Sequence, residues 1–275
     1  MRKLLSANFS RLWKNKALWI LISVSFALAL YGMGASARLA EARRDFPLSL
    51  EYYFFTVAPY MGLLCALFVP FYIGVEHSDN TIRNKLIVGH TRGTVYLSNY
   101  LVCIVGGLLF DAAWFIGFSP GLFFIGPFGF KWEVFMIYAI MIIGMTVSFM
   151  AIYTWISMIS TNKALTVIFD LVVWGVMVAV AETMEHQLSI SEFVGGQSYI
   201  DGKAVWVDLQ PNPKYISGWI RKFVTFVRDV LPQGQAILIA TNRIGQAFRK
   251  VGLSVILSLC VTGLGVFTFN RKDLK

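Results

Sequence analysis

Charged residues are scarce in this chain. Only 14% of its 275 residues are Asp, Glu, Lys or Arg, and 57% are hydrophobic, whereas ordinary soluble domains carry about 25% charged residues. So few charges cannot cover a water-facing surface. The composition therefore excludes an ordinary soluble protein and makes lipid the solvent for much of the chain.

Motifs of the common enzyme classes are also lacking. The chain has no phosphate-binding Gly-x-x-x-x-Gly-Lys loop and no His-Glu-x-x-His metal motif. It has three histidines, His77, His90 and His186, which fall on opposite sides of the membrane in the topology derived below. The sequence predicts that this chain is not an enzyme, has no catalytic residues or metal site, and binds no cofactor of its own.

Cysteines are few and show no pairing pattern. Cys65, Cys103 and Cys260 each lie inside an apolar run, where a free cysteine behaves as a small hydrophobic residue. Nothing in their spacing indicates a disulfide framework.

Long apolar stretches with few or no charges dominate what is present. The predicted spans are 17–37, 52–75, 95–116, 134–159, 164–181 and 251–269. Each can cross a hydrocarbon core of about 30 Å as a helix, and helices satisfy their own backbone groups in lipid. We expect one all-α domain over 1–275, a polytopic membrane helical bundle with six transmembrane helices. Residues 182–250 form its largest segment outside the membrane.

The orientation follows from Lys and Arg in the short loops. With the N-terminus inside, twelve basic residues fall inside and four fall outside, and basic residues favour the cytoplasmic side. The net charge of +9 is explained in this way without nucleic acid. Both termini are therefore predicted to be cytoplasmic and 182–250 extracellular, in a multi-pass protein of a cell membrane, the bacterial cytoplasmic membrane being the expected one.

The first sixteen residues have a pattern of their own. Leu4, Leu5, Phe9, Leu12 and Trp13 fall near one helical face among basic residues, which is typical of an amphipathic helix in the membrane interface. A solvated basic leader is the alternative. A cleaved signal peptide is a weaker one, because the following apolar run exceeds the usual 7–15 residues.

The segment 182–250 contains three local patterns. Asp201-Gly202 suits the turn of a small hairpin between 198–200 and 203–207. Apolar residues at helical spacing over 216–230, with basic residues between them, predict an amphipathic helix on the outer surface. The run 236–240 is too short to span and is predicted to dip into the bundle.

Two acids lie within the apolar spans, where an acid is a functional candidate by default. Asp111 falls near the outer edge, and we expect its side chain to reach interfacial water. Asp170 is about 10 Å from the inner edge by helical rise. It is a candidate for the transport path or for a contact with a neighbouring helix, and an incidental role is the alternative. Outside the fifth span, Glu182, Glu185 and His186 suggest either a weak cation site or, in preference, a solvated helix end.

The loop after the second span is the most informative stretch. It begins at Glu76 and contains a short amphipathic segment made of Thr81, Ile82, Arg83, Asn84, Lys85 and Leu86. A helix there would present Ile82 and Leu86 as anchors for a groove on a soluble partner, with Arg83 and Lys85 as charges on the rim. An ordinary basic inside loop is the alternative.

This loop resembles that of the ABC-2 type transporter permeases. Their pattern is a Glu that ends the second span, then roughly Gly-Thr-Ile-Arg-Asn-Lys-Leu, then Gly, Ser-Arg, and an aromatic residue with Ser at the start of the third span. The matching residues are Glu76, Thr81, Ile82, Arg83, Asn84, Lys85, Leu86, Gly89, Arg92, Tyr96 and Ser98. Asn80 replaces the usual Gly and Thr91 the usual Ser, which puts the turn before the helix in question. The resemblance extends to the basic N-terminal helix, the six spans and the C-terminal Phe-x-Phe-Asn-Arg-Lys-Asp that ends at Asp273.

The resemblance implies a permease subunit that pairs with a second permease subunit, identical or related, and with two soluble ABC ATPase subunits. ATP and Mg are expected on those ATPases, and the loop from Glu76 to Leu86 is expected to be the ATPase-coupling element. Such a permease exports a drug, peptide, lipid or similar substrate. Aromatic and Met residues in the spans suit an apolar cargo, but packing explains them equally well. The alternative is a non-transporting accessory or sensor subunit, and a membrane-embedded enzyme is disfavoured because no acid, base and nucleophile converge.

Overall fold

The computed structural model describes residues 2–42, 50–126, 129–200 and 203–272. Six long helices form its body: α2 (Lys16–Ala42), α4 (Ala58–Ser78), α6 (Arg92–Phe118), α8 (Trp132–Ile159), α9 (Lys163–Ser189) and α12 (Ala247–Arg271). All six are long and apolar enough to cross a membrane, two of them together with the short helix that adjoins them. The predicted all-α, multi-pass bundle of six candidate spans is confirmed at this level.

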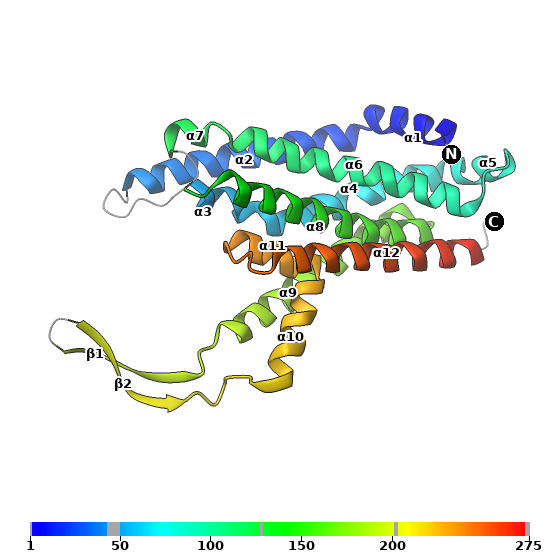
Figure 1. Cartoon of the computed structure of the whole chain (residues 1–275). Helices are drawn as coiled ribbons and strands as arrows, with labels where there is room; N and C mark the ends of the chain where they lie inside the picture. Colours follow the sequence, from blue (N-terminus) through cyan, green and yellow to red (C-terminus); the bar gives the residue numbers. More distant parts are fainter. Residues whose placement is uncertain (1, 43–49, 127–128, 201–202, 273–275) are drawn as a thin grey trace.

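Shorter elements connect these helices. They are α1 (Arg2–Lys14), α3 (Leu50–Phe54), the 3₁₀ helix η1 (Phe55–Val57), α5 (Thr81–Ile87), α7 (Gly121–Phe124), β1 (Phe193–Ile200), β2 (Lys203–Pro211), α10 (Gly218–Val230) and α11 (Pro232–Ala240). The start of α1 and the end of α12 lie beside α5 at one end of the bundle, here called the α5 end (Figure 1). The hairpin projects away from the bundle, and α10 runs across the direction of the long helices.

Three helices form the centre of the bundle. Helices α4, α6 and α8 contact one another, while α2 packs on α6, α9 on α4, and α12 on α8. Gly106 on α6 lies directly against Phe68 of α4, and Gly107 lies against Thr146 and Met150 of α8, so neither position has room for a Cβ. Close packing of this kind holds helices together in lipid, where burial of apolar surface gives little driving force. The outer helices keep an apolar face exposed for lipid.

Helix α11 is inserted among the long helices. It contacts α4, α8 and α9, and its side chains Gln233 and Gln235 are 1% and 0% exposed. Pro232 occupies the first turn, where its missing N–H costs no helical hydrogen bond. The predicted dip at 236–240 is therefore a helix that begins four residues earlier, and surrounding protein shields its backbone.

Several boundaries differ from the prediction. The first span, expected to end at 37, continues as α2 to Ala42, and the second, expected to begin at 52, begins as α4 at Ala58 after α3 and η1. The fifth span, expected to end at 181, continues as α9 to Ser189, because Glu185 finds cationic partners and does not need water. The hairpin is longer than expected, with Phe193 opposite Pro211 and Ile200 opposite Lys203. Its predicted turn, Asp201-Gly202, lies outside the described residues, as do Asp273 and Lys275 at the C-terminal end.

Candidate functional site

Helix α5 is held between two left-handed residues. Asn80, which precedes it, has φ 52° and ψ 22°, a conformation that asparagine tolerates better than most residues. Gly89 follows it at φ 98°. The N–H groups of Gly89 and His90 donate to the carbonyls of Leu86 and Lys85 at 3.0 and 3.1 Å and close the helix. Asn80 therefore makes the turn for which the family pattern has glycine.

Glu76 anchors this helix to the bundle. Its side chain is fully buried near the end of α4. Arg11 of α1 and Lys85 of α5 both form ion pairs with its Oε1. Asn99 of α6 donates from Nδ2 to Oε2 at 2.6 Å. One carboxylate therefore holds side chains from three other helices.

Asn8 of α1 extends the network. It donates to Ser98 Oγ at 2.7 Å and to Asn99 Oδ1 at 3.1 Å, and its own Oδ1 accepts from Lys85 Nζ at 2.8 Å. Its backbone carbonyl accepts from the Tyr72 hydroxyl at 3.0 Å. We call Asn8, Arg11, Glu76, Lys85, Ser98 and Asn99 the Glu76 cluster. It joins α1, α4, α5 and α6 at the α5 end.

The charges of the Glu76 cluster are unequal. Two cations face one carboxylate, and the side chains of Arg11 and Lys85 are only 25% and 11% exposed. Burial lowers the pKa of Lys85, and the Arg11 guanidinium lowers it further. The Glu76 carboxylate is the acid in contact with both cations. Removing one member of a buried pair leaves an uncompensated charge and is strongly destabilising. The cluster is therefore a stiff joint between α5 and the spans.

The face of α5 that points away from the bundle is not the predicted one. Ile82 is 2% exposed and packs inward, and Leu86 is partly buried against the same core. The interpretation of Ile82 as an anchor for a partner is wrong, because the left-handed turn at Asn80 directs that face of the helix toward the bundle. Lys85 is likewise an internal partner of Glu76 and not a rim charge. Ile87 and Val88 are 74% and 79% exposed and form the outward apolar pair.

The remaining loop residues divide in a similar way. Thr81 opens α5 and is partly exposed, while Arg83 and Asn84 are exposed on its outer side. The sequence analysis missed Asn8 and Asn99 altogether. Asn8 lies four residues from both Leu4 and Leu12, so it interrupts the apolar face of α1, and that interruption was the available signal. Leu4 and Leu12 of that stripe are buried against the protein itself, Leu5 and Phe9 are partly buried, and Trp13 is 47% exposed.

The two intramembrane acids both contact neighbouring helices. Asp111 is 7% exposed and accepts a hydrogen bond from Thr146 Oγ1 of α8 at 2.8 Å. The expectation that it reaches interfacial water is wrong, because α8 covers it. Asp170 is fully buried on α9, and its Oδ2 accepts from Ser157 Oγ of α8 at 3.3 Å. Its Oδ1 has no hydrogen-bond partner among the residues that the structure describes. Asp170 therefore faces a neighbouring helix and not an open path in this conformation.

No family model matches the chain, and no curated protein matches it. Function is therefore inferred from the loop pattern and from the contacts described here.

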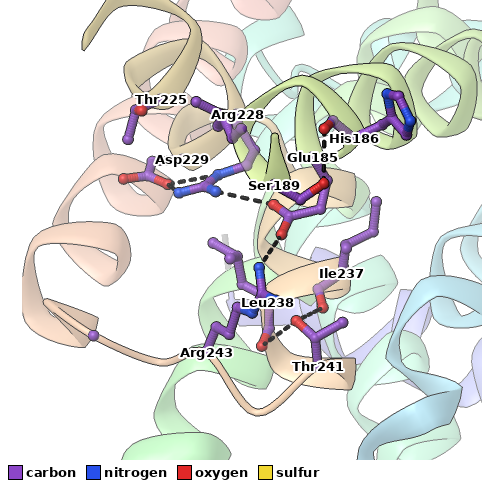
Figure 2. Close-up of polar contacts among 12 residues, drawn as sticks. Glu185, His186, Ser189, Thr225, Arg228, Asp229, Ile237, Leu238, Thr241 and Arg243 are labelled. Carbon is purple, nitrogen blue, oxygen red and sulfur yellow. Dashed lines mark hydrogen bonds and ion pairs between the residues drawn. The ribbon is translucent and has the colours of Figure 1, made fainter. Parts of the chain in front are cut away.

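A second polar cluster joins the far end of α9 to the segment that precedes α12. Arg228 of α10 bridges Glu185 and Asp229 at 2.9 Å each (Figure 2). Arg243 adds a second contact to Glu185 at 2.8 Å, and Arg249 pairs with Asp229, which is 1% exposed. We call these five residues the Glu185 cluster. Its ion pairs fix α9, α10, the loop after α11 and α12 relative to one another.

The Glu185 cluster decides between two interpretations of the end of α9. Glu185 already contacts two guanidinium groups, so its charge is neutralised within the protein. Among the described residues, no group of three His, Cys, Asp or Glu side chains is placed to hold a metal ion. The cation site at Glu182, Glu185 and His186 is therefore not supported. Glu182 and His186 are exposed, as expected for a solvated helix end, whereas Glu185 is bound by arginine.

Proposed function

We propose that the chain is the transmembrane permease subunit of an ATP-driven ABC-2 type exporter. It would work with soluble ABC ATPase subunits and a second permease subunit, and it would move a drug, peptide, lipid or similar substrate out of the cell. The loop pattern from Glu76 to Ser98 suggests this family. The observation that carries the proposal is the α5 helix, which is exposed on one side and tied to three other helices on the other side.

In this proposal the α5 end faces the cytoplasm, and α10 and the hairpin face outward. The excess of Lys and Arg in the loops at that end supports this orientation. ATP and Mg bind to the partner ATPase subunits, because this chain has no phosphate-binding loop. The membrane would be the bacterial cytoplasmic membrane.

The coupling step follows from the Glu76 cluster. The ATPase pair contacts the outward side of α5 through Ile87, Val88 and Arg83. When ATP closes that pair, the displacement of α5 passes through Lys85 and Glu76 to α4, and through Arg11 and Asn99 to α1 and α6. Rigid elements that share buried ion pairs move together. The spans then alternate access to a path between the two permease subunits.

Co-purification and ATPase activity of the reconstituted complex test this proposal. Ile87→Asp puts a charge into an apolar contact and should reduce the recovered ATPase at least tenfold, without changing the thermal stability of the permease. Leu209→Asp is the matched control, because Leu209 is also exposed, at 57%, but lies on the hairpin. It should leave recovery unchanged.

Two results would reject the proposal. If the wild-type chain recovers no ATPase when ABC ATPase subunits are co-expressed with it, the accessory or sensor function is favoured. If Ile87→Asp and Leu209→Asp behave alike, α5 is not the coupling element.

A further inference from the structure

Helix α10 has two faces of opposite character. Its apolar face carries Trp219, Ile220, Phe223 and Phe226, which are 46–74% exposed. The helix lies across the direction of the six long helices (Figure 1). A helix with this orientation and these side chains lies in the interface plane of a membrane, with its apolar face among the acyl chains.

The other face of α10, together with Phe226 at its border with the apolar face, lines a groove of about 580 Å³ against the start of α12. The lining residues are Gly218, Arg221, Lys222, Thr225 and Phe226 of α10 and Arg249 of α12. Three of them are cations, and none is an acid. Because one wall is aromatic and the others are basic, the groove suits a ligand that joins an anionic group to an apolar one.

Two cations of the groove, Arg221 and Lys222, have hydrogen-bonding or charge-pairing capacity that the protein does not use. Arg221 donates from one terminal nitrogen to the Leu188 carbonyl at 2.8 Å and stacks on Tyr215 at 4.7 Å. Its other terminal nitrogen is buried and has no hydrogen-bond partner among the described residues. Lys222 is exposed and forms no ion pair with any acid that the structure describes. Only Arg249 is neutralised, by Asp229.

Exposed apolar side chains of α12 follow Arg249, which lines the groove. Phe248, next to Arg249, is 76% exposed, and Ile256, two turns beyond Arg249 on the same face, is 59% exposed. An acyl chain lying along this face would begin at the groove. The apolar surface of the span and the basic groove are therefore continuous.

We propose that this groove binds the headgroup of an anionic phospholipid. Arg221 and Lys222 contact the phosphate, Thr225 lies beside it, and the acyl chains lie along α12 next to Phe248 and Ile256. The bound lipid fixes α10 at the interface. This site is independent of the exporter proposal, because it involves no residue of the Glu76 cluster or of α5.

Photocrosslinking of the purified full-length protein tests the site. A photoreactive phosphatidylglycerol is added to the protein in detergent, and crosslinked peptides are mapped by mass spectrometry. The matching phosphatidylcholine analogue serves as the uncharged comparison. A second basic groove, lined by Lys14, Lys16 and Lys163 at the α5 end, provides an internal reference in the same sample.

We expect phosphatidylglycerol to label peptides of α10 and the start of α12 in preference to phosphatidylcholine. Lys222→Glu should weaken that labelling about 30-fold, because each basic side chain near an anionic headgroup contributes roughly fivefold and reversal counts twice. Labelling at the reference groove should not change. Lys214→Glu is the matched control, because Lys214 is an exposed lysine of the same segment outside the groove, and it should change labelling less than twofold.

Three results would overturn the proposal. Equal labelling by both lipids would exclude headgroup recognition. Equal effects of Lys222→Glu and Lys214→Glu would show that labelling depends on the overall surface charge and not on the groove. Competition by millimolar inorganic phosphate that abolishes labelling would identify a site for a free anion and not for a lipid.

Discussion

The Glu76 cluster gives the sharpest test of the structure. Glu76→Gln keeps the shape of the side chain and still accepts from Asn99, but leaves Arg11 and Lys85 close together without a carboxylate. Breaking a buried ion pair from one side costs about 3–5 kcal/mol. Lys85→Met costs less, about 1–3 kcal/mol, because Glu76 keeps two of its three partners.

The double variant that combines Glu76→Gln with Lys85→Met shows whether the two residues form an ion pair or contribute independently to stability. Once Glu76 is neutral, Lys85 is an unpaired and largely buried cation, so its removal should cost little or should stabilise the protein. We therefore expect the double variant to be more stable than the sum of the single variants predicts, by at least about 1 kcal/mol, within the range of 0.5–3 found for contacting residues.

Thermal unfolding of the purified protein, followed by tryptophan fluorescence, measures these effects. For a chain of this size, 1 kcal/mol corresponds to about 2–4 °C in Tm, so Glu76→Gln should lower Tm by roughly 6–20 °C. The losses should persist at high salt, because buried pairs are weakly screened. Arg83→Met is the matched control on the same helix: its side chain is exposed, and its effect should stay within about 0.5 kcal/mol.

Two outcomes would refute this reasoning. Additivity of Glu76→Gln and Lys85→Met within about 0.5 kcal/mol would show that the two residues are not coupled. If Lys85→Met is as stable as Arg83→Met, Lys85 is a surface charge, as the sequence alone predicted, and not a buried partner of Glu76.

Three further predictions address other parts of the chain. Ile82→Asp should lower stability by about 3 kcal/mol or more, since it buries an unpaired charge, and normal thermal unfolding of this variant would contradict the inward orientation of α5. Asp170→Asn should shift Tm by less than about 4 °C, because the amide still accepts from Ser157, while transport in reconstituted vesicles falls; full transport would make Asp170 incidental. Single cysteines at Lys214 and Arg83, in a variant without native cysteines, should react with an impermeant reagent in intact cells at Lys214 only, and the reverse pattern would invert the topology.

The sequence determined the architecture because lipid imposes a simple rule. Six apolar stretches of sufficient length must be helices, since no other local structure satisfies the backbone in hydrocarbon, and the described part of the chain has six such helices. The short helix at Thr81–Ile87 and the amphipathic α10 were also readable, because side-chain periodicity is local information.

Only the tertiary structure decided which face of each helix meets which neighbour. The sequence shows that Ile82 and Leu86 share a face, but not that the left-handed turn at Asn80 directs this face inward. It shows how far along the third span Asp111 lies, but not that the Thr146 hydroxyl of α8 donates a hydrogen bond to it. Contacts of this kind join residues far apart along the chain, and hydrophobic periodicity carries no information about them.

The Glu76 cluster shows the same limit most clearly. Asn8, Arg11 and Asn99 read as ordinary in the sequence, and Glu76, Lys85 and Ser98 stand out there only as members of the loop pattern. They form a site only because α1, α4, α5 and α6 meet at one end of the bundle, where a buried carboxylate requires cationic and amide partners. The amino-acid pattern determined the helices, and their packing determined the site.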